Sequence, residues 1–122
     1  MATYSELTMR YFNSRKHGGK LPEATHVGEA GSRGGGPWIR LAVQARHEVV
    51  TTARWMSYGC PAAIACSEAV CDWAEGRRLA ELPSVTEAMV ADWVGGLPEG
   101  KEHCSRLAAE AVRGLVPAGS RD

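Results

Sequence analysis

The sequence has no excess of charge of either sign, because 14 lysines and arginines balance 14 aspartates and glutamates in 122 residues. This balance provides no broad attraction to nucleic acid or to anionic lipid, so neither is expected as a partner. No apolar run approaches the length that spans a bilayer. Residues 1–6 lack the basic-then-apolar pattern of a signal peptide. We therefore expect a cytoplasmic protein.

The sequence also lacks internal repeats and any break that would mark a second domain. Residues 1–122 are expected to form one domain with a modest core. Residues 1–20 would supply an N-terminal helix and a basic turn, and residues 117–122 a frayed tail. No Ser-His-Asp arrangement or paired-carboxylate motif stands out, which disfavours a hydrolase.

Hydrophobic patterning predicts a mixture of helices and antiparallel strands. Strands are expected near 25–28, over 38–45 and over 49–58, with a turn at 46–48. Helices are expected over 4–12 and 61–75, then from a capping box at Ser84–Glu87 to about residue 94, and finally from near residue 101. The glycine-rich segment 31–37 reads as a mobile loop.

Most of the cysteines and histidines have a plain structural interpretation. Cys66 and Cys71 fall inside the predicted helix 61–75, where free cysteine usually packs as a small hydrophobe. His17, His26 and His47 lie in predicted loops or turns without a cysteine or carboxylate at ligand spacing, so surface positions are expected.

Cys60 and the pair His103-Cys104 differ, because each stands where a helix is predicted to begin. A thiol at a helix N-terminus is favoured as the thiolate, the form that binds metals or attacks sulfur. Two thiols and an imidazole are ligands suited to zinc or to an iron–sulfur cluster. The spacing alone leaves two interpretations open: a metal or cluster site at Cys60, His103 and Cys104, or simple packing.

Two longer segments resemble the IscU/NifU family of iron–sulfur cluster scaffold proteins. Residues 53–65 contain Tyr-Gly-Cys-x-x-Ala-Ile-Ala, and residues 97–105 contain Leu-Pro-x-x-Lys-x-His-Cys-Ser. Weaker similarities lie at 11–15 and 75–79. The resemblance implies an α+β fold: a three-stranded antiparallel sheet with helices packed on it, including a short N-terminal helix and a long C-terminal helix.

The resemblance also implies a scaffold or carrier rather than an enzyme. Such a protein accepts sulfur from a cysteine desulfurase and iron from a donor, holds a [2Fe-2S] cluster and passes it to apo-protein acceptors. By position, Cys60 and Cys104 would be thiolate ligands and His103 a third ligand or a proton donor. Lys101 would stabilise the anionic site.

The chain departs from the family pattern at two places. Gly35 stands where the family has its first cysteine, and Pro37 where it has an aspartate. The segment 97–101 replaces the Leu-Pro-Pro-Val-Lys string read by an Hsp70-type chaperone, so that chaperone is not favoured as a partner.

These departures leave several hypotheses open. Zinc could bind Cys60, His103 and Cys104 with water in the fourth position, in a sulfur acceptor with sulfurtransferase-like activity. A homodimer could bridge a cluster through four thiolates, or an outside thiol could complete the ligand shell. Alternatively, the chain could be a metal-free module that regulates the assembly machinery.

Overall fold

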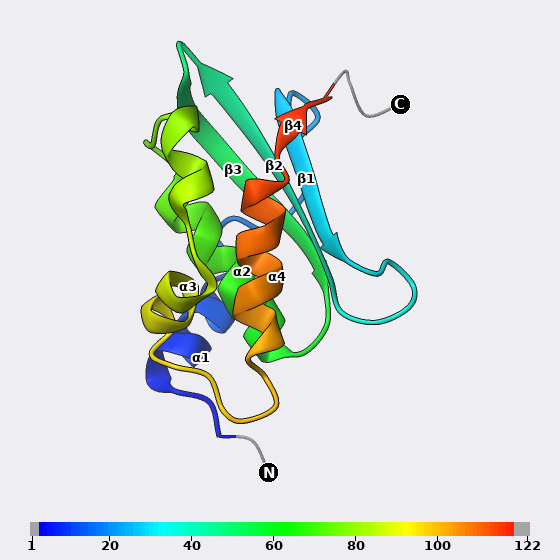
Figure 1. Ribbon diagram of the computed structural model, residues 1–122, viewed down its shortest axis with the longest axis vertical. Helices are drawn as coiled ribbons and strands as arrows, with labels where there is room; N and C mark the ends of the chain where they lie inside the picture. The colour runs from blue at the N-terminus through cyan, green and yellow to red at the C-terminus, as the bar shows by residue number, and fades with distance from the viewer. Residues whose placement is uncertain (1–2, 119–122) are drawn as a thin grey trace.

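The computed structural model describes residues 3–118. In chain order the elements are α1 (Glu6–Ser14), β1 (His26–Gly31), β2 (Trp38–Arg46), β3 (Val49–Tyr58), α2 (Pro61–Ala74), a 3₁₀ helix (Leu79–Ser84), α3 (Glu87–Trp93), α4 (His103–Arg113) and β4 (Val116–Pro117). The predicted α+β class is confirmed, with helices gathered over an antiparallel sheet (Figure 1). Over the described range, every helix is too short or too polar to cross a membrane.

The strands form an antiparallel sheet in the order β3-β2-β1-β4. β2 and β3 are joined by a two-residue turn, His47-Glu48, whose φ angles of 53° and 67° are left-handed. Such a turn matches the right-handed twist of the two strands that it connects. The predicted strands over 38–45 and 49–58 are confirmed to within one residue.

The fourth strand was not expected. β4 pairs with the start of β1, and the backbone N–H of Ala118 donates to the Thr25 carbonyl at 2.9 Å. The prediction of a frayed tail is therefore wrong for Pro117 and Ala118, because backbone hydrogen bonding at the sheet edge holds this segment. The rest of the predicted tail, residues 119–122, lies outside the described residues.

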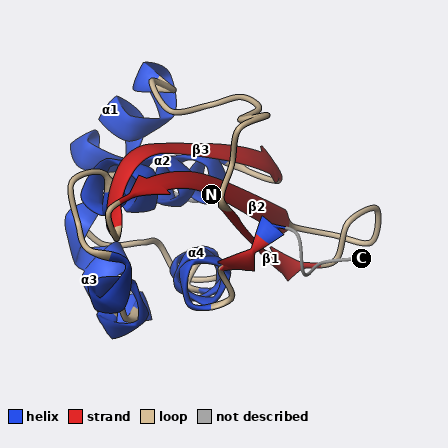
Figure 2. Ribbon diagram, turned by 90° about the horizontal axis from the view of Figure 1, so that it is seen from above, coloured by secondary structure: helices blue, strands red, loops and turns tan. Residues whose placement is uncertain are grey.

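The core lies between one face of the sheet and the helices (Figure 2). Ile39, Leu41 and Val43 alternate along β2 toward this face, and each is at most 3% exposed. α4 can approach β1 closely because Gly28 has no side chain. A Cβ atom there would lie 2.4 Å from the carbonyl oxygen of Ala111, which is far inside van der Waals contact.

Helix α2 begins and ends where the sequence predicts. Pro61 takes the first helical position, and Gly76, with φ of 90°, follows the C-cap residue Glu75. Cys66 and Cys71 are 0% and 1% exposed. Their predicted packing role is therefore confirmed.

Helix α3 begins differently from the prediction. Ser84 does not cap it, because Ser84 ends the preceding 3₁₀ helix and its hydroxyl donates to the Glu81 carbonyl at 2.6 Å. Thr86 is the N-cap residue instead, and its side-chain oxygen accepts from the Met89 amide at 3.1 Å. The predicted capping box at Ser84–Glu87 is thus wrong by two residues.

Helix α1 is fixed at its start to the end of α3. Ser5 caps α1 by accepting from the Thr8 amide at 3.0 Å. Thr8 is fully buried, and its hydroxyl donates to the Val94 carbonyl at 2.8 Å. The predicted helix over 4–12 is present but lies two residues later.

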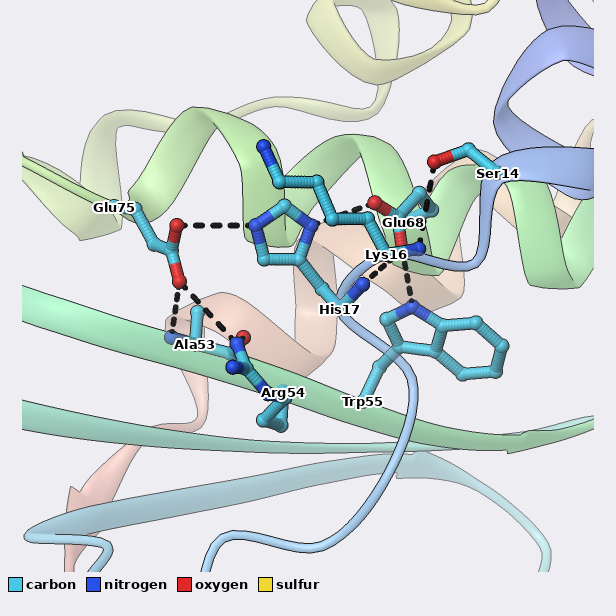
Figure 3. Close-up of polar contacts among 8 residues, drawn as sticks. All are labelled: Ser14, Lys16, His17, Ala53, Arg54, Trp55, Glu68 and Glu75. Carbon is cyan, nitrogen blue, oxygen red and sulfur yellow. Dashed lines mark hydrogen bonds and ion pairs between the residues drawn. The ribbon is translucent and has the colours of Figure 1, made fainter.

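His17 contradicts the sequence-based expectation of a surface position, since it is only 1% exposed. Its Nδ1 lies 2.6 Å from Oε2 of Glu68, and its Nε2 lies 3.0 Å from Oε1 of Glu75 (Figure 3). Glu68 also accepts from the indole N–H of Trp55 at 2.8 Å. The two carboxylates are 51 and 58 residues further along the chain, so no local spacing reveals them.

The turn that carries His17 also covers the edge of β3. The Trp55 amide donates to the His17 carbonyl at 2.9 Å, and the Gly19 amide donates to the Trp55 carbonyl at 3.0 Å. Glu75 accepts from the Ala53 amide at 2.9 Å. These bonds satisfy backbone groups that an edge strand would otherwise leave exposed to other chains.

Candidate functional site

The starts of α2 and α4 bring two cysteines together at one end of the molecule (Figure 1). Cys60 is the N-cap residue of α2, and Cys104 is the second residue of α4. Their Sγ atoms lie 3.8 Å apart although 44 residues separate them in sequence. Cys60 is half-buried and Cys104 is fully buried.

The two thiols have opposite pKa shifts. Burial by itself raises the pKa of Cys60, but the amides of Ala63 and Ala62, the thiol of Cys104 and the charge of Lys101 together bring it below the ordinary value. This is the effect expected of a helix N-terminus on a thiol.

Cys104 does not behave as its helix position predicts. Burial, the neighbouring charge of Cys60 and the hydrogen bond between the two sulfurs raise the pKa of Cys104 to about 12. Lys101 opposes this rise but does not overcome it. The expectation that each thiol is favoured as a thiolate is therefore wrong for Cys104, because burial outweighs the helix N-terminus.

His103 and Lys101 lie beside the thiol pair. The Nε2 atom of His103 is 3.6 Å from Sγ of Cys104. The positive charge of Lys101 acts on both cysteines in the direction that favours a thiolate. The structure therefore brings together all four residues singled out from the sequence, with Cys104 as the common contact of Cys60 and His103.

Tyr4 is a neighbour of the site that sequence reasoning missed. Burial, the charge of Cys60 and a hydrogen bond with its sulfur raise the pKa of the Tyr4 hydroxyl. Tyr4 lies just before α1, far in sequence from both cysteines, and no spacing pattern marks it.

The glycine-rich loop between β1 and β2 ends next to the thiol pair. Pro37 lies beside Gly59, since a Cβ atom on Gly59 would be 3.9 Å from Pro37 Cβ. Gly35 is exposed in a turn where its amide donates to the Ser32 carbonyl at 2.9 Å. A Cβ atom on Gly35 would clash with the Ser32 hydroxyl at 2.7 Å. Neither Gly35 nor Pro37 offers a side-chain ligand.

Among residues 3–118, no group of three or more His, Cys, Asp or Glu side chains is already arranged to hold a metal ion. What the described site offers is a close pair of thiols, one of them acidic, with an imidazole in contact with the other. Such a pair can supply soft ligands or a sulfur nucleophile.

The fold and this site define an α+β protein with two helix starts that converge on a thiol pair. Comparison with known sequences matches residues 3–117 to the family described as NifU-like N terminal domain. The chain belongs to this family.

Relatives cover most of the chain. It is 33% identical over 113 residues to the iron-sulfur cluster assembly scaffold protein IscU 1 of Archaeoglobus fulgidus, which covers 93% of this chain and 74% of that protein. It is 29% identical over 117 residues to the iron-sulfur cluster assembly scaffold protein IscU of Escherichia coli, covering 93% and 91% of the two chains. The family predicted from the two sequence segments is confirmed.

Solved structures show the same fold at lower sequence identity. FiSufU from Fervidobacterium islandicum AW-1, described as a cluster assembly scaffold protein for the SUF system, aligns with a TM-score of 0.71 at 18% identity over 89% of this chain and 93% of that chain. A NifU-like N-terminal protein from Brucella abortus aligns with a TM-score of 0.59 at 22% identity over 89% and 76%.

Proposed function

We propose that this protein is an iron–sulfur cluster assembly scaffold or carrier that holds a [2Fe-2S] cluster as its cargo through Cys60 and Cys104. The observation that carries the proposal is the 3.8 Å separation of the two Sγ atoms, which two helix starts bring together. Membership in a family whose relatives are named scaffold proteins supports the same role. The protein would act as a carrier and not as an enzyme.

The chemistry of the pair fits this role. Cys60, with its lowered pKa, would engage iron first. Cys104 would lose its proton as iron arrives, because a coordinated thiol is deprotonated by the metal itself. His103, whose Nε2 lies 3.6 Å from Sγ of Cys104, would act as a third ligand or as a proton donor, and Lys101 would offset the negative charge of the loaded site.

A cluster of this type takes four protein ligands, more than these residues supply. We propose that the missing ligands come from outside the chain. A second copy would give two, its own Cys60 and Cys104; if His103 is the third ligand, a single small thiol would complete the set. Neither Gly35 nor Pro37 has a side chain that could be a ligand, so an incoming ligand would take the place of the family's cysteine and aspartate. A cysteine desulfurase would supply the sulfur, and apo-proteins would receive the cluster from this carrier.

Anaerobic reconstitution with iron and sulfide tests the proposal. The wild-type protein is expected to develop the visible absorption of a cluster, and Cys60→Ser or Cys104→Ser to abolish it. Cys71→Ala is the matched control, because Cys71 is buried and neither Cys60 nor Cys104 is among the groups that act on it, so the absorption should stay intact. A colourless wild-type product, or full absorption in both serine variants, would contradict a scaffold role.

A second candidate function is a zinc-bound sulfur acceptor, which the acidity and partial exposure of Cys60 favour. The Cys60 thiolate would attack the outer sulfur of a desulfurase persulfide, forming a persulfide on Cys60 and releasing the enzyme's thiolate. Metal content and native mass of anaerobically isolated protein separate the two candidates. Iron with sulfide in a dimer supports the carrier, whereas zinc in a monomer with a trapped Cys60 persulfide supports the acceptor.

A further inference from the structure

The face of the sheet opposite the helices carries a cavity of about 520 Å³. Trp38, Arg40 and Ala42 line it from β2, where they alternate with the core residues Ile39 and Leu41 and therefore point to the other side of the sheet. The segment 19–24, which leads from the His17 turn toward β1, supplies the opposite wall. The cavity is thus separated from the helix-covered core by the sheet itself.

The lining of this cavity is rich in cationic residues. Lys20, Arg33, Arg40 and Arg54 contribute four cationic side chains, and none of the described residues that line the cavity is acidic. The whole chain has a formal charge of zero, so this concentration of positive charge is a local feature. A concave basic surface raises the local concentration of anions.

Contacts around the cavity orient its cationic and aromatic groups. The indole N–H of Trp38 donates to the Glu29 carboxylate, and the ring is only 6% exposed. The guanidinium of Arg33 lies 4.9 Å from the centroid of that ring, a cation–π contact. Arg54 is held on its other side by Glu75, with Nη1 3.4 Å from Oε2. Side chains held by such contacts require little reorganisation when a ligand binds.

Arg40 occupies the middle of this arrangement. It lies on the central strand β2, directly between Glu29 of β1 and Met56 of β3. Leu21, Pro22 and Met56 add apolar wall to the cavity. A planar guanidinium pairs with carboxylate or phosphate through two parallel hydrogen bonds, and an apolar wall suits the carbon part of an organic molecule.

From this geometry we propose that the cavity is a binding site for a small organic polyanion that carries two or more carboxylate or phosphate groups. The volume is in the range of cavities that bind small molecules. The site lies on the opposite face of the sheet from the core, and it neither uses the thiol pair nor depends on cluster binding.

Isothermal titration at constant ionic strength tests the proposal with three probes. Citrate carries carboxylates, ATP carries phosphates, and adenosine is the uncharged counterpart of ATP. Saturable binding of citrate or ATP, with no binding of adenosine, is expected, and the anion that binds identifies the preferred group. Absence of saturable binding by both anions, or binding of adenosine equal to that of ATP, overturns the proposal.

Variants assign the binding to the cavity. Arg40→Gln is expected to lower the affinity for the anion by about tenfold or more, because it removes a charge-assisted pair. Arg46→Gln is the matched control, since Arg46 is an exposed residue of the same strand outside the cavity. Arg33→Gln, in the loop, replaces Arg40→Gln if circular dichroism shows that the latter does not fold. Equal affinities of the cavity variant and the control would also overturn the proposal.

Discussion

Cys60 and Cys104 show how strongly local surroundings separate two residues of the same type. Their Sγ atoms lie 3.8 Å apart, yet the pKa of Cys60 falls and that of Cys104 rises to about 12. Cys60 is half-buried at the N-cap of α2, where backbone N–H groups face its sulfur, whereas Cys104 is fully buried. Cys60 is therefore the more acidic thiol of the pair, and Cys104 is the one that holds its proton more strongly.

This difference predicts selective alkylation of the metal-free protein. At neutral pH, iodoacetamide should modify Cys60 well before Cys104, Cys66 or Cys71, because only Cys60 combines exposure with a lowered pKa. Lys101→Gln should raise the pKa of Cys60 and slow its alkylation by about twofold, a small effect because the charge is screened. Peptide mass spectrometry over a pH series measures both rates.

Lys16→Gln is the control for this experiment, since Lys16 is an exposed cation in the turn beside His17 and is not among the groups that shift the pKa of Cys60. Alkylation of Cys104 at the same rate as Cys60 would show that the two environments are not distinct.

At the scale of elements, each helix start has a specific task. The starts of α2 and α4 place the thiol pair, and the start of α1 bonds to the end of α3 through Thr8 and Val94. Helix α3 is only 7 residues long, so its stability depends on packing and on its cap more than on its own propensity. The cap is Thr86, although the sequence around Ser84 carries the more familiar capping pattern.

Replacing each candidate cap distinguishes the two assignments. Thr86→Ala should lower the free energy of unfolding by about 1 kcal/mol, because the Met89 amide loses its acceptor. Ser84→Ala should lower the free energy of unfolding clearly less, since the Ser84 hydroxyl is exposed and bonds only within the 3₁₀ helix. Urea unfolding of both variants measures the difference. If Ser84→Ala lowered the free energy of unfolding more than Thr86→Ala did, Ser84 would be the N-cap residue, as the sequence pattern predicts.

For the whole molecule, the cluster of buried His17, buried Glu68 and half-buried Glu75 joins the N-terminal turn, α2 and the edge of β3 (Figure 3). Glu68 accepts from both the backbone and the ring of His17, and Glu75 bonds His17 and the Ala53 amide. The cluster therefore helps to cover the exposed edge of β3. It also fixes the start of segment 19–24, which lines the cavity on the other face of the sheet.

This cluster predicts a pH-dependent contribution to stability from Glu75. Burial raises the pKa of Glu75, but the Ala53 amide, His17 and Arg54 together lower it below its ordinary value of 4.5. Ionised Glu75 therefore stabilises the fold fully above that value, and the stabilisation is lost as the pH falls through the lower, folded-state pKa.

Glu75→Gln should thus be less stable than wild type by about 1 kcal/mol near neutral pH, and the difference should shrink as the solution is acidified to about pH 3. Urea unfolding across this range measures it. Glu110→Gln is the control, because the pair of Glu110 with Arg106 is exposed and 4.0 Å long, and it should have little effect at any pH. If the difference in the free energy of unfolding between Glu75→Gln and wild type grew on acidification, the pKa of Glu75 would not be lowered in the folded protein.

Local patterns in the sequence were enough to predict several elements and the family. Alternation indicated β2, β-branched and aromatic residues indicated β3, Pro61 and Gly76 bounded α2, and the two cysteine segments indicated the family. These features depend on residues close together in the chain, where propensity and periodicity act directly.

The folded structure was needed for every feature that depends on contacts between distant segments. It buried His17 between Glu68 of α2 and the C-cap residue Glu75, added β4 to the sheet edge, and shifted the pKa values of Cys60 and Cys104 in opposite directions. It also gathered four cations from separate strands and loops around one cavity. Burial, desolvation and long-range hydrogen bonding depend on where the whole chain places each group, so no spacing along the sequence reveals them.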